Sequence, residues 1–138
     1  MDPDSILGKL ESLALCVRRI ESKRPVDLES LECDIDIQDI IVINLERAVQ
    51  TCVDIGAHIL SDYSVASPLS MADVFRTMAE KELIDAALAE RLARSVGFRN
   101  IAVHQYQTIS WKIVYSIISM HMDDFRLFAR YIENLLKH

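Results

Sequence analysis

The sequence predicts an all-α protein, built as a four- or five-helix antiparallel bundle. Hydrophobic residues make up 51% of the 138 residues, whereas glycine and proline occur three times each. This composition favours long helices over a sheet protein, which needs many turns. Apolar residues also recur at steps of three and four, which places them on one face of a helix. The length fits one helical domain spanning residues 1–138.

The first predicted helix follows the acidic start of the chain. Asp4 or Ser5 can cap its N-terminus. Its buried stripe comprises Ile6, Leu10, Leu13, Val17 and Ile20. Pro25 cannot continue a helix, so we expect the segment to end before it. The acidic connection to about Asp36 is predicted to be a loop or a short turn.

A second, longer helix is predicted from about Ile37 to Leu60. The residues expected to face inward are Ile40, Ile41, Asn44, Leu45, Ala48, Cys52, Ile55 and Ile59. Residues 61–70, which include Pro68, are expected to form a loop.

The second half of the chain is predicted to add three helical segments. Ser70 can cap a short helix from 71 to about 81. Residues 83–96 form the next helical stretch, and a last helix is expected to start at Ser110. The apolar residues of that last helix are Trp111, Val114, Tyr115, Ile118, Met122, Phe125, Phe128 and Leu136.

The charge distribution argues against a general nucleic-acid coat protein, which would be strongly basic. The whole chain has a net charge of -6. Residues 86–112, however, hold four basic residues and one acidic residue, a balance of +3, against 11 basic and 20 acidic residues elsewhere. This distribution fits an enzyme that contacts RNA locally and whose acidic body faces a basic partner.

Cysteine usage and the N-terminal sequence indicate a cytoplasmic protein. Cys16, Cys33 and Cys52 are odd in number and contain no Cys-x-x-Cys pair, which argues against a disulfide framework or a zinc site. We interpret Cys33 and Cys52 as packing residues. The acidic N-terminus lacks the basic start of a signal peptide, and no apolar run is long enough to cross a bilayer. We expect no cofactor, no metal and no membrane association.

The stretch Phe98-Arg99-Asn100-Ile101-Ala102-Val103-His104-Gln105-Tyr106 contains the candidate catalytic residues. The Arg99 guanidinium offers paired donors that suit phosphate oxygens. His104 can give or take a proton near neutral pH. Together they supply charge stabilisation and proton transfer, which is what phosphodiester cleavage without a metal requires. Taken alone, an Arg and a His five residues apart are more often a surface pair or a helix cap.

Helical spacing restricts how these side chains can meet. On a straight helix, His104 lies about 140° around the axis from Arg99, whereas Tyr106 returns to within about 20° of it. For all three to reach one substrate, the helix must end or loosen near His104, or a second subunit must complete the site. Gly97 upstream and the hydroxyl residues Thr108 and Ser110 downstream favour a break.

These residues resemble the HepT toxins of the HEPN ribonuclease superfamily. Arg99, Asn100, His104 and Tyr106 match the family pattern position by position, late in a small helical chain. The resemblance extends over nearly the whole chain, including Asp54-Ile55-Gly56-Ala57-His58-Ile59. It implies the toxin of a type VII toxin–antitoxin pair, partnered by a minimal nucleotidyltransferase antitoxin.

The resemblance also implies roles for the four residues. Arg99 and His104 would be catalytic in a metal-independent endoribonuclease, in which the ribose 2′-OH attacks its own phosphate, so that DNA is excluded. Asn100 would orient His104 or a phosphate oxygen, or else form only a helix-end hydrogen bond. Tyr106 would position the substrate and accept AMP from the antitoxin, with a half-buried structural tyrosine as the alternative.

Two further readings remain open at the level of sequence. Asp54 and His58 can pair on one helix face, as a structural hydrogen bond or as part of a proton relay or metal site. The apolar run Ile40–Ile43 and the pair Ile117-Ile118 exceed what a small core uses, which suggests a two-fold homodimer; the alternative is a wide core stripe in a monomer. The competing function is a non-catalytic nucleotide- or RNA-binding helical interaction module.

Overall fold

The computed structural model describes residues 2–137, and within this range it contains α-helices, one short 3-10 helix and no strand. The elements are α1 (Pro3–Lys23), α2 (Leu28–Glu32), α3 (Ile35–Leu60), α4 (Met71–Glu80), α5 (Ala86–His104), η1 (Tyr106–Thr108), α6 (Trp111–Met120) and α7 (Asp123–Lys137). The all-α bundle predicted from the sequence is confirmed. None of the helices described is long and apolar enough to span a membrane.

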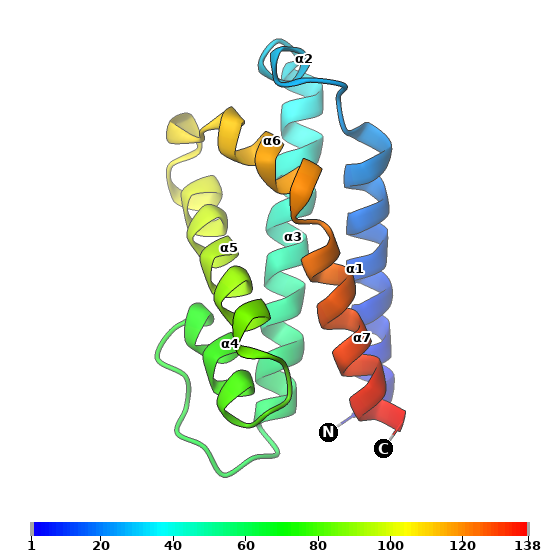
Figure 1. Cartoon of the computed structure of the whole chain (residues 1–138), viewed down its shortest axis with the longest axis vertical. Helices are drawn as coiled ribbons and strands as arrows, with labels where there is room; N and C mark the ends of the chain where they lie inside the picture. The colour runs from blue at the N-terminus through cyan, green and yellow to red at the C-terminus, as the bar shows by residue number, and fades with distance from the viewer. Residues whose placement is uncertain (1, 138) are drawn as a thin grey trace.

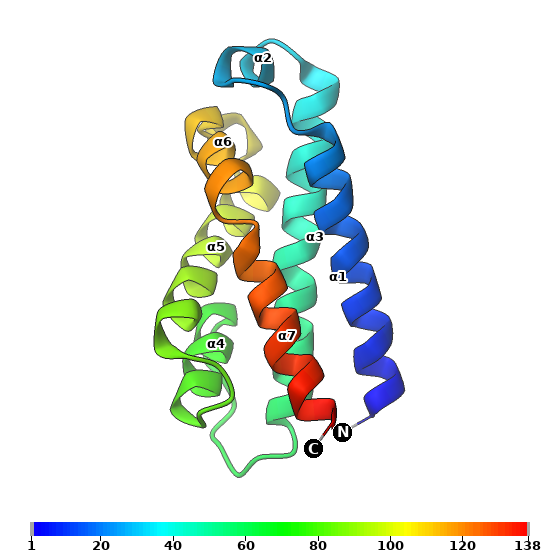
Figure 2. The same ribbon diagram turned by 45° about the vertical axis from the view of Figure 1, so that its right-hand side comes forward.

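The long helix α3 is the centre of the bundle. It packs against α1 along one side and against α4 and α5 along the other, while α7 lies over the front (Figures 1 and 2). The first turn of α1 and the last turn of α7 lie at one end of the molecule, whereas α2 and the end of α5 lie toward the opposite end. The C-terminal end of α5, which includes Arg99 and His104, therefore lies far from the first turn of α1 and the last turn of α7.

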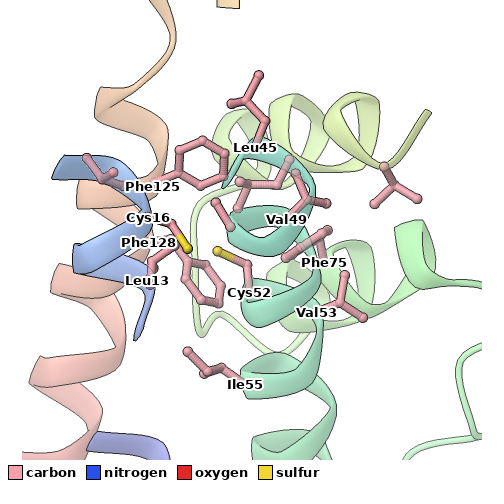
Figure 3. Packing of buried hydrophobic residues seen from close by; sticks show 14 of the residues in the cluster. Leu13, Cys16, Leu45, Val49, Cys52, Val53, Ile55, Phe75, Phe125 and Phe128 are labelled. Carbon is pink, nitrogen blue, oxygen red and sulfur yellow. The ribbon is translucent and has the colours of Figure 1, made fainter. Parts of the chain in front are cut away.

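The core is apolar and closely packed around α3. Figure 3 shows Cys16 from α1 and Phe128 from α7 directed toward Cys52 on α3. The Phe128 ring also meets the edge of Phe75 from α4, with ring centroids 6.0 Å apart, a favourable aromatic geometry. Burial raises the pKa of the Cys52 thiol, so it stays protonated and acts as a small hydrophobe. The packing role expected for Cys52 is confirmed.

Helix boundaries follow the capping residues. Asp34 caps α3 and Ser70 caps α4 through side-chain bonds to backbone N–H groups, and the Ser70 cap is as predicted. The first helix starts earlier than expected, because Asp2 accepts bonds from two backbone N–H groups of the first turn and leaves Asp4 and Ser5 inside the helix. The acidic connection contains the short helix α2, which ends at an exposed Cys33, so the packing role assigned to Cys33 is wrong.

The second half of the chain differs from expectation in two places. Glu82 has a left-handed backbone (φ 60°), which creates a turn and delays the start of α5 to Ala86. Asp85 caps that helix by accepting a 2.6 Å bond from the Leu88 N–H. The predicted last helix is split at His121, and the acidic pair Asp123-Asp124 opens α7, where carboxylates interact favourably with a helix N-terminus.

Candidate active site

The helix that carries Arg99 ends at His104. Gln105 leaves helical geometry (φ −141°, ψ 48°), while its N–H still donates to the Ile101 carbonyl at 2.7 Å. The chain then forms the single 3-10 turn η1, which starts at Tyr106. The helix break expected near His104 is therefore present.

Because of this break, the side chains of Arg99, His104 and Tyr106 do not share one face of a helix. Arg99 and His104 belong to the same α-helix, so they diverge by about 140° around its axis. Tyr106 lies beyond the helix and does not return above Arg99, as it would on a straight one. Within residues 2–137 no hydrogen bond joins any two of these three residues.

Arg99 carries a charge that no carboxylate of the described chain neutralises. Its Nη1 donates to the Asn100 Oδ1 at 3.4 Å, and its Nε is shielded from solvent without a hydrogen-bond partner. Buried donors are nearly always paired. On the same helix, Arg91 instead forms an ion pair with Asp124 at 2.8 Å. Arg99 thus remains available for an anion.

His104 and Asn100 share one exposed face at the end of α5, because they lie four residues apart. The His104 ring is open to solvent, so a substrate can reach it. Asn100 contacts the Arg99 guanidinium and does not bond to His104 or to a backbone group at the helix end. The structure therefore associates Asn100 with the cation.

Tyr106 is anchored by α3. Its hydroxyl donates to the Asp39 Oδ1 at 2.6 Å, and its ring meets the edge of Trp111 with centroids 6.2 Å apart. Burial and the neighbouring Asp39 carboxylate raise the pKa of Tyr106 to about 12. The residue is nevertheless 41% exposed, so part of it remains accessible although its hydroxyl is hydrogen-bonded. Sequence reasoning did not identify Asp39, since nothing around it points to a residue 67 positions away.

An apolar groove runs beside these residues, between α5 and α6. It has a volume of about 590 Å³, and its walls include Phe98 and Ile101 from α5 and Ile113 and Ile117 from α6. Ile101 and Ile113 are exposed. The groove therefore presents apolar side chains of α5 and α6 to solvent.

The apolar run on α3 does not supply the surface expected of it. Ile41 and Val42 are buried in the core, and only Ile43 is exposed. Ile118 is likewise buried, whereas Ile117 lines the groove. The prediction that Ile40–Ile43 forms an interface is wrong for most of the run, because α1 and the other helices around α3 cover it.

Asp54 and His58 do not form a pair. Asp54 accepts a hydrogen bond from Gln50 at 2.9 Å, and the His58 Nε2 accepts one from the Asp2 N–H at 3.3 Å. His58 therefore links the end of α3 to the start of α1. Across the described residues no group of three or more His, Cys, Asp or Glu side chains is placed to hold a metal ion.

Comparison with known proteins identifies close relatives over almost the full length. A family model described as Ribonuclease HepT-like matches residues 13–132. The mRNA nuclease HepT of Shewanella oneidensis is 34% identical over 130 residues, which cover 94% of this chain and 97% of that protein. The tRNA nuclease HepT of Aphanizomenon flos-aquae is 25% identical over 136 residues, covering 99% and 92%.

A solved structure is similar in three dimensions as well. It is the tri-AMPylated HEPN toxin of Shewanella oneidensis in complex with an MNT antitoxin. That toxin is 34% identical to this chain, with a TM-score of 0.89 and coverage of 97% of this chain and 99% of the toxin.

Proposed function

This chain belongs to the HepT-like ribonuclease family, and from that membership we propose that it is the toxin of a toxin–antitoxin pair, acting as an endoribonuclease. The observation that carries the proposal is the end of α5. There an arginine without a carboxylate partner and an exposed histidine lie five residues apart on one helix. These are the two groups that RNA cleavage by internal attack requires.

The reaction follows from the chemistry of these two groups. His104 accepts the proton of the ribose 2′-OH as that oxygen attacks the adjacent phosphorus. Arg99 stabilises the negative charge that develops on the phosphate oxygens. The bond to the 5′ oxygen of the next nucleotide breaks, leaving a 2′,3′-cyclic phosphate. DNA lacks the attacking hydroxyl, so the substrate is RNA, and no step requires a metal ion.

The divergence of Arg99 and His104 supports a site completed by a second copy of the chain. A two-fold pairing through the groove between α5 and α6 would bury Ile101 and Ile113 and bring two copies of the α5 end together. An isologous contact of this kind is the commonest form of homodimer. Each cleft would then contain arginine and histidine side chains from both protomers.

The antitoxin regulates this site through Tyr106. The related toxin of Shewanella oneidensis carries AMP groups in its complex with an MNT antitoxin, and Tyr106 is an accessible phenol at the edge of the catalytic segment. An AMP group on this oxygen would place a negative phosphodiester beside the catalytic segment. It would repel the RNA backbone and obstruct its entry by bulk.

The catalytic proposal is tested with purified protein and RNA in excess chelator. Wild-type protein is expected to cleave and to leave 2′,3′-cyclic phosphate ends. Arg99→Ala and His104→Ala should each lower the rate at least about 100-fold, the contribution typical of such groups, with unchanged helical content. Arg19→Ala removes an exposed arginine of α1 and is the matched control, with the wild-type rate expected.

Two results would contradict the catalytic proposal. Loss of cleavage in chelator that magnesium restores would mean that a metal takes part. Cleavage that survives His104→Ala would favour the non-catalytic RNA-binding module, with the nuclease activity arising from a contaminant.

The regulatory proposal is tested by co-expression with the cognate nucleotidyltransferase antitoxin. Intact mass should show AMP-sized additions, and peptide mapping should place them on Tyr106. Tyr106→Phe removes the acceptor oxygen, so this variant should remain toxic beside the antitoxin if its nuclease is active. Complete neutralisation of an active Tyr106→Phe variant would instead favour inhibition by complex formation alone.

A further inference from the structure

The bond between Tyr106 and Asp39 joins the modification acceptor to a second, separate element. The phenol oxygen lies 2.6 Å from the Asp39 Oδ1, a length typical of a charge-assisted O–H···O⁻ bond. Asp39 is in the second turn of α3, whereas Tyr106 starts the 3-10 turn after α5. Both side chains are exposed, so another molecule can approach the bonded pair.

A phenol in this setting is a poor nucleophile until its proton is removed. The pKa of Tyr106 is raised to about 12 by burial and by the Asp39 carboxylate. Very little phenolate therefore exists at neutral pH. The transfer of AMP to this oxygen needs a base that takes the proton while the new bond forms.

We propose that Asp39 is the base that activates Tyr106 for nucleotidylation, so that the toxin supplies part of the machinery for its own inactivation. The inference rests on the proposed function, since it assigns a residue to the modification reaction of the same site. Asp39 meets the geometric requirement for a general base, because its carboxylate already accepts the hydrogen bond from the proton that must leave.

The step balances as follows. The Tyr106 oxygen attacks the α-phosphorus of ATP, and a phenol–phosphorus bond forms. The bond between that phosphorus and the bridging oxygen to the β-phosphate breaks, and pyrophosphate leaves with the electron pair. The phenol proton moves to the Asp39 Oδ1 and from there to water. No oxidant or reductant is needed.

Two contacts, to Asp39 and to Trp111, orient the Tyr106 ring. The turn η1 has no side-chain cap at its N-terminus, so the Asp39 bond and the edge contact with Trp111 fix the direction of the ring. Because α3 is the central helix of the bundle, Asp39 is a firm anchor for this bond. Because the phenol donates the bond to Asp39, the lone pairs of its oxygen remain free to face an incoming phosphorus.

The test compares wild-type toxin with Asp39→Asn, using the cognate antitoxin, ATP and Mg²⁺. Asparagine keeps an oxygen that can accept the phenol bond but cannot take the proton. The maximal rate of AMP transfer should fall at least about 100-fold, while the toxin concentration for half-maximal rate stays unchanged. The remaining rate should increase about tenfold for each pH unit, because hydroxide must then remove the proton, whereas the wild-type rate should be nearly flat near neutral pH.

Matched variants separate proton transfer from charge and from folding. Asp36→Asn removes the same charge one turn earlier on α3 and should be modified at the wild-type rate. Asp39→Glu retains a carboxylate and should recover part of the rate. Circular dichroism should show the wild-type helical content for all three variants.

Two outcomes would overturn the inference while leaving the proposed function intact. One is wild-type modification of Asp39→Asn, which would place the base in the antitoxin. The other is a change confined to the half-maximal concentration, which would make Asp39 a docking residue. Absence of any AMP on wild-type Tyr106 would instead reject the regulatory proposal itself, and the inference with it.

Discussion

The hydrogen bond between Asp39 and Tyr106 contributes to a raised pKa of this tyrosine. The carboxylate accepts a hydrogen bond from the neutral phenol and repels the phenolate, and burial acts in the same direction. The folded-state pKa of Tyr106, about 12, lies above its unfolded value of about 10. The bond therefore stabilises the fold fully below pH about 10, and this contribution is lost as the pH rises to about 12.

We predict that NMR of ring-labelled tyrosine will show Tyr106 ionising near pH 12. Asp39→Asn removes the negative charge, so it should lower the pKa of Tyr106 toward the ordinary value of about 10. Asp36→Asn should leave the titration unchanged. An Asp39→Asn titration identical to that of the wild type would show that the carboxylate does not act on the phenol in solution.

The sequence identified the candidate residues that are close together along the chain, and it could not identify their distant partner. The candidate residues form a local sequence pattern, and their side-chain types indicate the chemistry; they are Arg99, Asn100, His104 and Tyr106. Asp39 lies on another helix, α3, whose first two turns also contain Asp36, so nothing in the sequence distinguishes it. Only the folded chain brings it within hydrogen-bond distance of Tyr106, and a contact between residues 67 positions apart leaves no local sequence signal.

At the scale of elements, the contact between α3 and α4 depends on the absence of a side chain at Gly56. A Cβ there would lie 2.7 Å from the Val74 Cγ1 and 2.9 Å from the Met78 Sδ. Met78 is flexible and can move aside, but the β-branched Val74 has little rotamer freedom in a helix. An added methyl group would therefore push the two helices apart.

We predict that Gly56→Ala lowers the free energy of unfolding by about 1–2 kcal/mol, because overpacking outweighs the better helix propensity of alanine. Gly8→Ala is the control, since a Cβ at Gly8 meets nothing within 4 Å. That variant should raise the free energy of unfolding by about 0.5–1 kcal/mol. Urea denaturation measures both, and a stabilised Gly56→Ala variant would show that α4 moves freely.

Apolar periodicity predicted the long helices well, because burial of one face is a property of the local pattern. It did not predict the interruption at His121, where no glycine or proline marks a break. There α6 and α7 follow different directions across the bundle (Figure 2), and the apolar spacing continues through the bend. The short helix α2 was missed for a similar reason, since Leu31 is its only buried residue.

At the scale of the whole molecule, the groove between α5 and α6 is the surface on which the proposed dimer depends. Ile113 is 57% exposed and stands at its wall. Exposed apolar side chains beside a catalytic segment suit a contact between two copies.

We predict that the protein is a dimer at micromolar concentration and that Ile113→Asp converts it to a monomer with little RNA cleavage. A buried charge at a two-fold contact is repeated on both sides, so its cost is doubled. Leu69→Asp alters an equally apolar residue, 96% exposed in the loop before α4, and should remain dimeric and active. Light scattering decides the mass, and a monomeric wild type with full activity would refute the composite site.

The placement of the two chain ends has a practical consequence. The first turn of α1 and the last turn of α7 lie side by side, at the end of the bundle away from the C-terminal end of α5 (Figures 1 and 2). A fluorescent reporter or a surface tether attached at this end of the bundle would therefore lie far from the end of α5 that carries the proposed RNA site. Modification of labelled toxin can thus be followed by fluorescence, because the fluorophore lies away from the proposed site.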